Sequence, residues 1–305
     1  MKHLYFFFFA FLLGLLCPAQ NQKTFQEQLN KVQELRDLSN DSSYDIDKRI
    51  EFGEEAVAES YKTNVDTVIL KSKRNLSLLV IQDGDFDRFK TISFENLEES
   101  IRIKDTTSIA HSNYFLGFYY HLLEEHDSAY YYYYQSTKLY QFLNDIKRRG
   151  EVLYNMANIQ EVEGDYIGGE TNAIAAISLI QQLPETESNL ETLWSAHNTI
   201  AIVSAEMEQY DRALDYYNKT LEICERMEEP YENRLFSNIN IAALYRRKKD
   251  FQTAERLYQK LREDDKVYEY DPTSYSIILS GLAQSKFKNA SAKNDEIVDL
   301  FNEAY

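Results

Sequence analysis

The stretch IAALYRRKKDFQTAERLY, residues 241–258, holds the pattern that decides the fold. Two segments with helical apolar spacing flank a polar turn, and small residues lie at Ala242 and Ala254. The helical position that Ala254 occupies recurs along the chain, and the successive equivalent residues are 39, 40, 40, 44, 41 and 43 residues apart. Because a fixed period of this size is typical of stacked helical hairpins, the sequence predicts an all-α fold. The aligned positions are Ile50, Phe89, Ala129, Gly169, Ala213, Ala254 and Ile297.

Small and aromatic residues hold fixed places in these repeats. Small residues let two helices approach to about 8–10 Å, and aromatic rings can fill the groove beside the crossing. We therefore expect the two helices of each hairpin to cross at the small positions. Twelve residues before the aligned positions lie Gly117, Ala157, Ala201 and Ala242, and four residues after them lie Tyr133, Ala173, Tyr217, Tyr258 and Phe301.

Turn-forming residues separate the predicted helices. Gly84-Asp85-Phe86 and Gly164-Asp165-Tyr166 mark the turns inside two hairpins, where glycine can end one helix with a positive φ and aspartate can cap the next. Pro184, Pro230 and Pro272 fall between one hairpin and the following one. Proline lacks an N–H donor and disfavours helix at the residue before it, so each proline predicts a boundary between repeats.

The pattern resembles the tetratricopeptide repeat. The quoted stretch matches the family as Ile241-Ala242, Tyr245, Phe251, Ala254 and Tyr258. The period exceeds the family's usual length of about 34 residues by one or two helical turns. The resemblance implies a right-handed superhelical solenoid of about seven hairpins over residues 20–305, whose first helices line a concave face. It also implies a protein or peptide partner in that concave groove, and no cofactor.

The N-terminal sequence MKHLYFFFFAFLLGLLCPAQ predicts export. Lys2 precedes an unbroken apolar run of 13 residues, Leu4 to Leu16, which is too short to span a bilayer and fits the core of a signal peptide. We expect residues 1–19 to be removed, which places a mature protein starting at Gln20 in the periplasm or outside the cell. Two alternatives stay open: a lipid anchor on Cys17 and an uncleaved N-terminal anchor.

The charge of the chain excludes two classes of ligand. The formal net charge is −17, and loss of Lys2 with the signal peptide makes it −18. An acidic chain repels nucleic acid and anionic lipid, so we expect neither as a ligand. No later apolar run approaches the 18 residues of a transmembrane helix. Cys224 is the one cysteine left after cleavage, and its helical phase beside Ala213 and Tyr217 predicts a buried thiol.

Polar and aromatic residues on the predicted first helices are the candidate binding site. Asn75, Asn155 and Asn240 occupy the same position in their repeats. Because an amide has both a donor and an acceptor, a row of amides can hold an extended peptide backbone. The alternative is that each asparagine bonds the neighbouring repeat, and that the aromatic and histidine residues only pack successive helices together. The candidates are Asn75, His111, Tyr114, Phe118, His121, Tyr154, Asn155, Asn158 and Asn240.

Catalytic and metal-binding motifs are missing from the sequence. His121 and Glu125 are one helical turn apart, but the HExxH order and a supporting Cys/His cluster are absent. There is also no glycine-rich phosphate loop and no GxSxG motif. The run Tyr130–Tyr134 spreads over all faces of a helix, so it predicts one core residue, Tyr133, rather than a stacking platform. We therefore expect no metal, no cofactor and no catalysis.

These observations predict an exported scaffold that binds a protein or peptide. The leader, the Tyr- and Asn-rich composition and the long repeats resemble the sensory N-terminal regions of Bacteroidetes-type signalling proteins, which precede a transmembrane helix and an output domain. A self-contained periplasmic or secreted adaptor is the alternative, and an enzyme with a site in the groove is a third. Because the last predicted helix carries Ile297, Phe301 and Ala304 without a polar cap, we expect the protein to continue beyond Tyr305.

Overall fold

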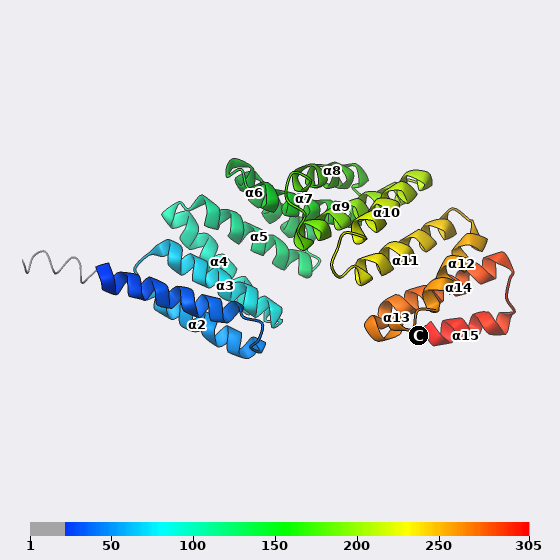
Figure 1. Cartoon of the computed structure of the whole chain (residues 1–305). Helices are drawn as coiled ribbons and strands as arrows, with labels where there is room; N and C mark the ends of the chain where they lie inside the picture. The colour runs from blue at the N-terminus through cyan, green and yellow to red at the C-terminus, as the bar shows by residue number, and fades with distance from the viewer. Residues whose placement is uncertain (1–21, 305) are drawn as a thin grey trace, which may run out of the picture. The chain divides into compact units, whose positions relative to one another are not determined.

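The computed structural model of the protein describes residues 22–304, and the regular secondary structure of these residues is α-helical, without a β-strand (Figure 1). The predicted all-α fold is confirmed. The chain divides between Leu143 and Asn144 into two compact units, called unit 1 and unit 2 below. The predicted signal peptide with Cys17, and the C-terminal Tyr305, lie outside the described residues.

Within its described residues, unit 1 contains three helical hairpins, and from α2 onward each helix packs on the next along the chain (Figure 1). The hairpins pair a helix over residues 22–40 with α2 (Ile46–Lys62), α3 (Asp66–Gln82) with α4 (Phe86–Ile103), and α5 (Thr106–Leu122) with α6 (His126–Phe142). We call the two members of each pair the first and the second helix.

The described residues of unit 2 form four further hairpins and one short helix. Its first helices α7, α9, α11 and α14 also contact one another in that order, so they form a layer of their own. The pairs are α7 (Ile146–Val162) with α8 (Tyr166–Ile180), α9 (Glu187–Glu206) with α10 (Tyr210–Cys224), α11 (Tyr231–Arg247) with α12 (Phe251–Arg262), and α14 (Pro272–Asn289) with α15 (Asn294–Ala304). Helix α13 (Lys266–Tyr270) lies between α12 and α14, and the sequence pattern did not predict it.

The turns between helices share one backbone conformation. Residues 64, 84, 104, 124, 144 and 164, spaced 20 apart, all have φ between 54° and 86°. Only Gly84 and Gly164 are glycines, while Asn64 and Asn144 are asparagines, which adopt the left-handed conformation more readily than most residues. The predicted aspartate caps are present, since Asp85 accepts from the backbone N–H of Arg88 at 3.0 Å and Asp165 from that of Gly168 at 3.0 Å.

The prolines stand where the repeats meet, as predicted. Pro184 lies in the loop between α8 and α9, and Pro230 is the residue before the first turn of α11. Pro272 is the first residue of α14, where Asp271 accepts from the N–H of Thr273. A proline at the first helical position loses no hydrogen bond, because that N–H has no partner inside the helix.

The helices cross at the predicted small residues. Ala157, Ala201 and Ala242 are fully buried. A Cβ atom on Gly117 would lie 2.5 Å from Cδ1 of the fully buried Tyr133, so that crossing admits only glycine without movement. Gly281 plays the same part in α14, and its Cβ would lie 2.3 Å from Cζ of a tyrosine on α12 of the preceding hairpin. The sequence pattern did not single out Gly281.

Two smaller predictions about buried side chains are also confirmed. Cys224 is fully buried, and its burial raises the pKa of the thiol. Within the tyrosine run, Tyr133 is in the core while Tyr131 and Tyr134 are 57% and 45% exposed. The run therefore supplies one core ring and several surface rings, because consecutive residues of a helix point in different directions.

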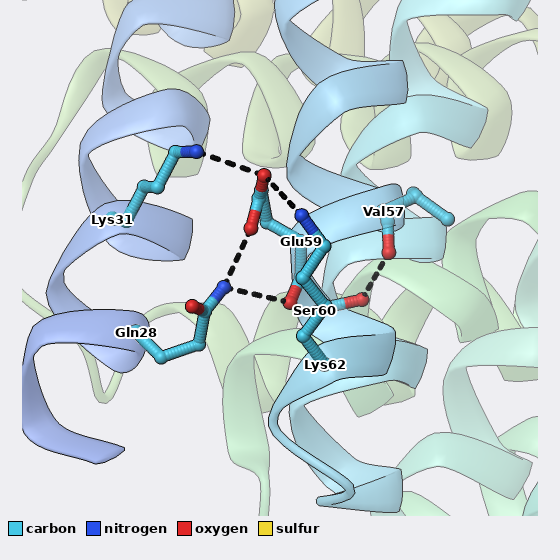
Figure 2. Close-up of polar contacts among 6 residues, drawn as sticks. All are labelled: Gln28, Lys31, Val57, Glu59, Ser60 and Lys62. Carbon is cyan, nitrogen blue, oxygen red and sulfur yellow. Dashed lines mark hydrogen bonds and ion pairs between the residues drawn. The ribbon is translucent and has the colours of Figure 1, made fainter. Parts of the chain in front are cut away.

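A cluster of polar contacts joins the helix over residues 22–40 to α2 (Figure 2). The carboxylate of Glu59 accepts from Lys31 Nζ at 2.8 Å, from Lys62 Nζ at 2.8 Å and from Gln28 Nε2 at 2.6 Å. Gln28 Nε2 also donates to the backbone oxygen of Glu59 at 3.2 Å. These bonds, led by that from Lys31, lower the pKa of Glu59 to about 2. The cluster therefore holds the two helices of the first hairpin together.

Candidate functional site

The layer of first helices in unit 2 presents a row of partly exposed polar side chains, which we call the inner face. Tyr154, Asn155 and Asn158 lie on α7, Asn198 on α9 and Asn240 on α11, and all five are partly exposed. Four of them were predicted from the sequence. Asn198 was missed, because it stands one residue away from the phase that Asn155 and Asn240 share.

The amides of the inner face are arranged across helices. Asn240 Nδ2 donates to Asn198 Oδ1 at 3.0 Å, which joins α11 to α9. This bond leaves the amide donors of Asn198 and the amide oxygen of Asn240, and neither has a further hydrogen bond among the side chains that the structure describes. The pair is therefore consistent with both alternatives, bonding between neighbouring repeats and peptide binding. It ties neighbouring repeats together, and it offers a donor and an acceptor to a bound backbone.

The α7 end of the inner face is less open. Burial raises the pKa of Tyr154, and the neighbouring Ser195 of α9 acts on it in the opposite direction. Burial and the nearby Glu206 also raise the pKa of Glu161. Glu206 in turn pairs with Arg247 of α11 at 2.5 Å. The charged groups at this edge thus compensate one another in part and leave the amides as the principal contacts available.

A groove of about 450 Å³ lies between α11 and α14, and we call it the inner groove. Its walls mix small, apolar and hydroxyl side chains with one guanidinium group, that of Arg246, which donates to Gln284 Oε1 at 2.6 Å. No carboxylate lies within ion-pair distance of Arg246 among residues 22–304. The lining includes Asn240, Ala243 and Arg246 of α11 and Ser276, Ile277 and Ser280 of α14.

In unit 1, two of the predicted residues are occupied by packing. Asn75 is 8% exposed and its Nδ2 donates to Ser39 Oγ at 2.6 Å. His111 is also 8% exposed, and its Nδ1 lies 2.7 Å from the hydroxyl of Tyr140 on α6. For these two side chains the packing alternative accounts for the observed contacts. Their role in binding stays a prediction.

The other three candidates of unit 1 are partly exposed on α5. The rings of Tyr114 and His121 lie 5.9 Å and 6.3 Å from that of Tyr133, and the Phe118 ring lies 6.4 Å from that of Phe89. Burial, and then the neighbouring His126, lower the pKa of His121, so its imidazole is neutral at pH 7. Tyr114, Phe118 and His121 thus form one aromatic surface that also contributes to packing.

Metal-binding geometry is not found in the part of the chain that the structure describes. No group of three His, Cys, Asp or Glu side chains there is placed to hold a metal ion. Among residues 22–304, no helix combines the length and the apolar character that crossing a bilayer requires.

Comparison with known proteins agrees with this architecture. Residues 191–266 match the family model of the tetratricopeptide repeat. No curated protein matches the chain by sequence. The family match covers most of α9 to α12, two neighbouring hairpins of unit 2. These two hairpins match the tetratricopeptide repeat, and the predicted resemblance to that repeat is confirmed.

Solved structures extend the likeness to most of the chain. The apo form of RapI is 14% identical, with 92% of this chain and 75% of that chain covered and a TM-score of 0.67. NprR in complex with its cognate peptide NprX is 15% identical, with 93% and 76% covered and a TM-score of 0.62. BtubC from P. vanneervenii is 17% identical, with 74% and 93% covered and a TM-score of 0.61. The protein has the fold of a tetratricopeptide-repeat solenoid.

Proposed function

We propose that the inner face of unit 2 binds an extended peptide segment of a partner protein, without catalysis. The observation that carries the proposal is the row of partly exposed amides on successive first helices, Asn155 and Asn158 on α7, Asn198 on α9 and Asn240 on α11. A peptide backbone presents alternating donors and acceptors, and each amide side chain offers one of each.

The inner groove supplies the rest of such a site. Ala243 and Ile277 give it apolar walls, and Arg246 gives it a cation that has no carboxylate partner among the described residues. Two of the similar structures support a peptide as the ligand class. NprR was solved with its cognate peptide NprX, and a Rap protein was solved with the Competence and Sporulation Factor.

The place of action belongs to the same proposal. The apolar N-terminal run from Leu4 to Leu16 supports export to the periplasm or beyond, with cleavage after Ala19. In that compartment the solenoid acts as the sensory region of a bacterial signal-transduction protein, and a self-contained adaptor or assembly factor is the alternative. The nucleotide sequence that follows the codon for Tyr305 distinguishes the two, because only the first requires an output domain.

Peptide binding is tested with the purified full chain and a phage-displayed library of random twelve-residue peptides. Peptides selected on the protein should bind the Asn158→Ala, Asn240→Ala double variant about tenfold more weakly or worse, since each lost hydrogen bond costs about 0.5–1.5 kcal/mol. Asn218→Ala is the matched control, because Asn218 is an exposed amide on the second helix α10. Equal binding to all three proteins would refute a site on the inner face.

A further inference from the structure

A second groove lies at the turn end of the last two hairpins of unit 2, and we call it the turn-end groove. Its volume is about 660 Å³. Most of its wall is apolar, from Phe251 at the start of α12, Phe287 near the end of α14, and Val298 and Phe301 on α15. Arg246 and Gln284 line both this groove and the inner groove, so the two lie on either side of their hydrogen bond.

Neighbouring hairpins in unit 2 pack closely on one another. Where α11 packs on the hairpin of α9 and α10, Ile241 and Leu244 join Ala205 and Ala213 in one cluster, and each is less than 9% exposed. The last two hairpins also close their contact, since Ala254, Leu282 and Ala283 are fully buried in one cluster, and the turn-end groove lies beside it. Phe287 is 59% exposed and Val298 is 54% exposed. Apolar surface that stays open beside a polar rim is typical of an interaction site.

The charged side chains of the turn-end groove are both cationic. Among the described residues, neither Arg246 nor Lys288 has a carboxylate within ion-pair distance. Lys286, on the same helix as Lys288, is compensated, since it pairs with Glu296 at 2.8 Å. In a chain with a net charge of −17, two uncompensated cations beside exposed apolar rings create a local preference for an anionic ligand.

We propose that the turn-end groove docks a partner's peptide segment that carries apolar side chains next to an aspartate or glutamate. The apolar side chains cover Phe287 and Val298, and the carboxylate reaches the guanidinium of Arg246 or the ammonium of Lys288. A segment fits better than a small molecule, because small-molecule sites enclose about 70–90% of the ligand, whereas Phe287 and Val298 in these walls are more than half exposed. The proposal is independent of the amide row on the inner face, since it depends on apolar and cationic contacts.

The test selects random twelve-residue phage-displayed peptides on the purified full chain, with prior depletion on the Phe287→Ser, Val298→Ser double variant. Both positions are largely exposed, so the variant should keep its helical circular dichroism. Recovered peptides should carry Asp or Glu beside apolar residues and bind the native protein about tenfold more tightly than the double variant. Lys288→Glu, and Asp→Asn or Glu→Gln changes in the peptide, should weaken binding further.

Three controls separate this groove from its neighbours. Ile277→Ser changes an apolar residue on the same helix that lines only the inner groove, and Ile167→Ser changes one on α8 that is 74% exposed. Both should leave the affinity of the recovered peptides unchanged, as should the Asn158→Ala, Asn240→Ala pair that tests the inner face. Equal affinity for the native protein and the double variant would overturn the proposal, as would peptides without acidic residues. The proposal would also be overturned if the native protein were a dimer and the double variant a monomer, since the occupant would then be a second copy of the chain.

Discussion

Replacing Gly117 by alanine should destabilise unit 1, although alanine is the better helix former. The new Cβ would lie 2.5, 2.8 and 2.9 Å from three ring carbons of Tyr133. Contacts this short require movement, and a rigid ring cannot bend away as the end of a flexible side chain can. Tyr133 is fully buried and also contacts the rings of Tyr114 and His121, so it has little room to shift.

The magnitude follows from two opposing effects. Forcing a methyl group into a packed core costs about 1–3 kcal/mol, and the high end applies here because the ring is held on several sides. Replacing glycine by alanine inside a helix contributes about 1 kcal/mol in the other direction. The net loss in the free energy of unfolding should be about 1–2 kcal/mol, which lowers the melting temperature of a unit of this size by roughly 4–8 °C or somewhat more.

A matched substitution in the same unit isolates the packing effect. Gly53 of α2 is also buried in a helix, but the shortest contacts of its Cβ would be with the methyl ends of Leu79 and Leu76, at 3.1 and 3.2 Å. Gly53→Ala should therefore change the free energy of unfolding by less than about 0.5 kcal/mol, because the helix preference offsets a small push. Both variants are compared by urea denaturation followed by circular dichroism.

A third variant completes the test. Tyr133→Leu removes the ring, so Gly117→Ala should cost less in that background than in the native one, with a coupling energy of about 1 kcal/mol or more. The reasoning fails if Gly117→Ala is as stable as the native protein. It also fails if Gly53→Ala loses as much stability, since the crossing would then not distinguish a ring from a flexible side chain.

Three further predictions concern the core, the pH dependence and the N-terminus. Ala213→Asp places a charge at a fully buried position and should cost about 3 kcal/mol or more, and an unchanged melting temperature would show that the helical phase is wrong. Burial lowers the pKa of His197 to about 4, below the value of about 6.5 in the unfolded chain, so its contribution to stability is complete above pH 6.5 and is lost as the pH falls towards 4. When the pH is lowered from 7 to 4.5, the urea concentration at the midpoint of unfolding should therefore decrease less in His197→Gln than in the native protein. The intact mass of the exported protein should correspond to a chain that starts at Gln20, and a diacylglycerol adduct on Cys17 would contradict cleavage by the ordinary signal peptidase.

Much of the fold could be predicted from the sequence because its determinants are local. A period near 40 residues, small residues such as Ala201 and Ala242, and prolines such as Pro230 each act within one hairpin or one loop. Helix caps are equally local, since Asp85 and Asp165 bond N–H groups three residues ahead. Patterns of this kind do not depend on how one hairpin packs on another.

The candidate binding residues were only partly predictable, because the position of a residue around a helix gives the direction of its side chain and not its exposure. Asn75, Asn155 and Asn240 share one phase, yet Asn75 is buried against Ser39 while Asn155 and Asn240 are partly exposed. His111 likewise shares a face with Tyr114 and is held by Tyr140. Whether a side chain reaches solvent depends on what the next hairpin places beside it.

What only the tertiary structure decided are the contacts between hairpins. Three such features involve residues that lie about 20 to 50 positions apart in the sequence. They are the bond from Asn240 to Asn198, the close approach of Gly281 to Tyr258, and the walls of the turn-end groove. A shift of one helix by a fraction of a turn would remove any of them without changing the repeat pattern. The sequence by itself therefore determined the paired helices of the repeats and how each hairpin closes, although not the short helix α13. The rotation of packed helices against one another determined which surfaces stay open for a partner.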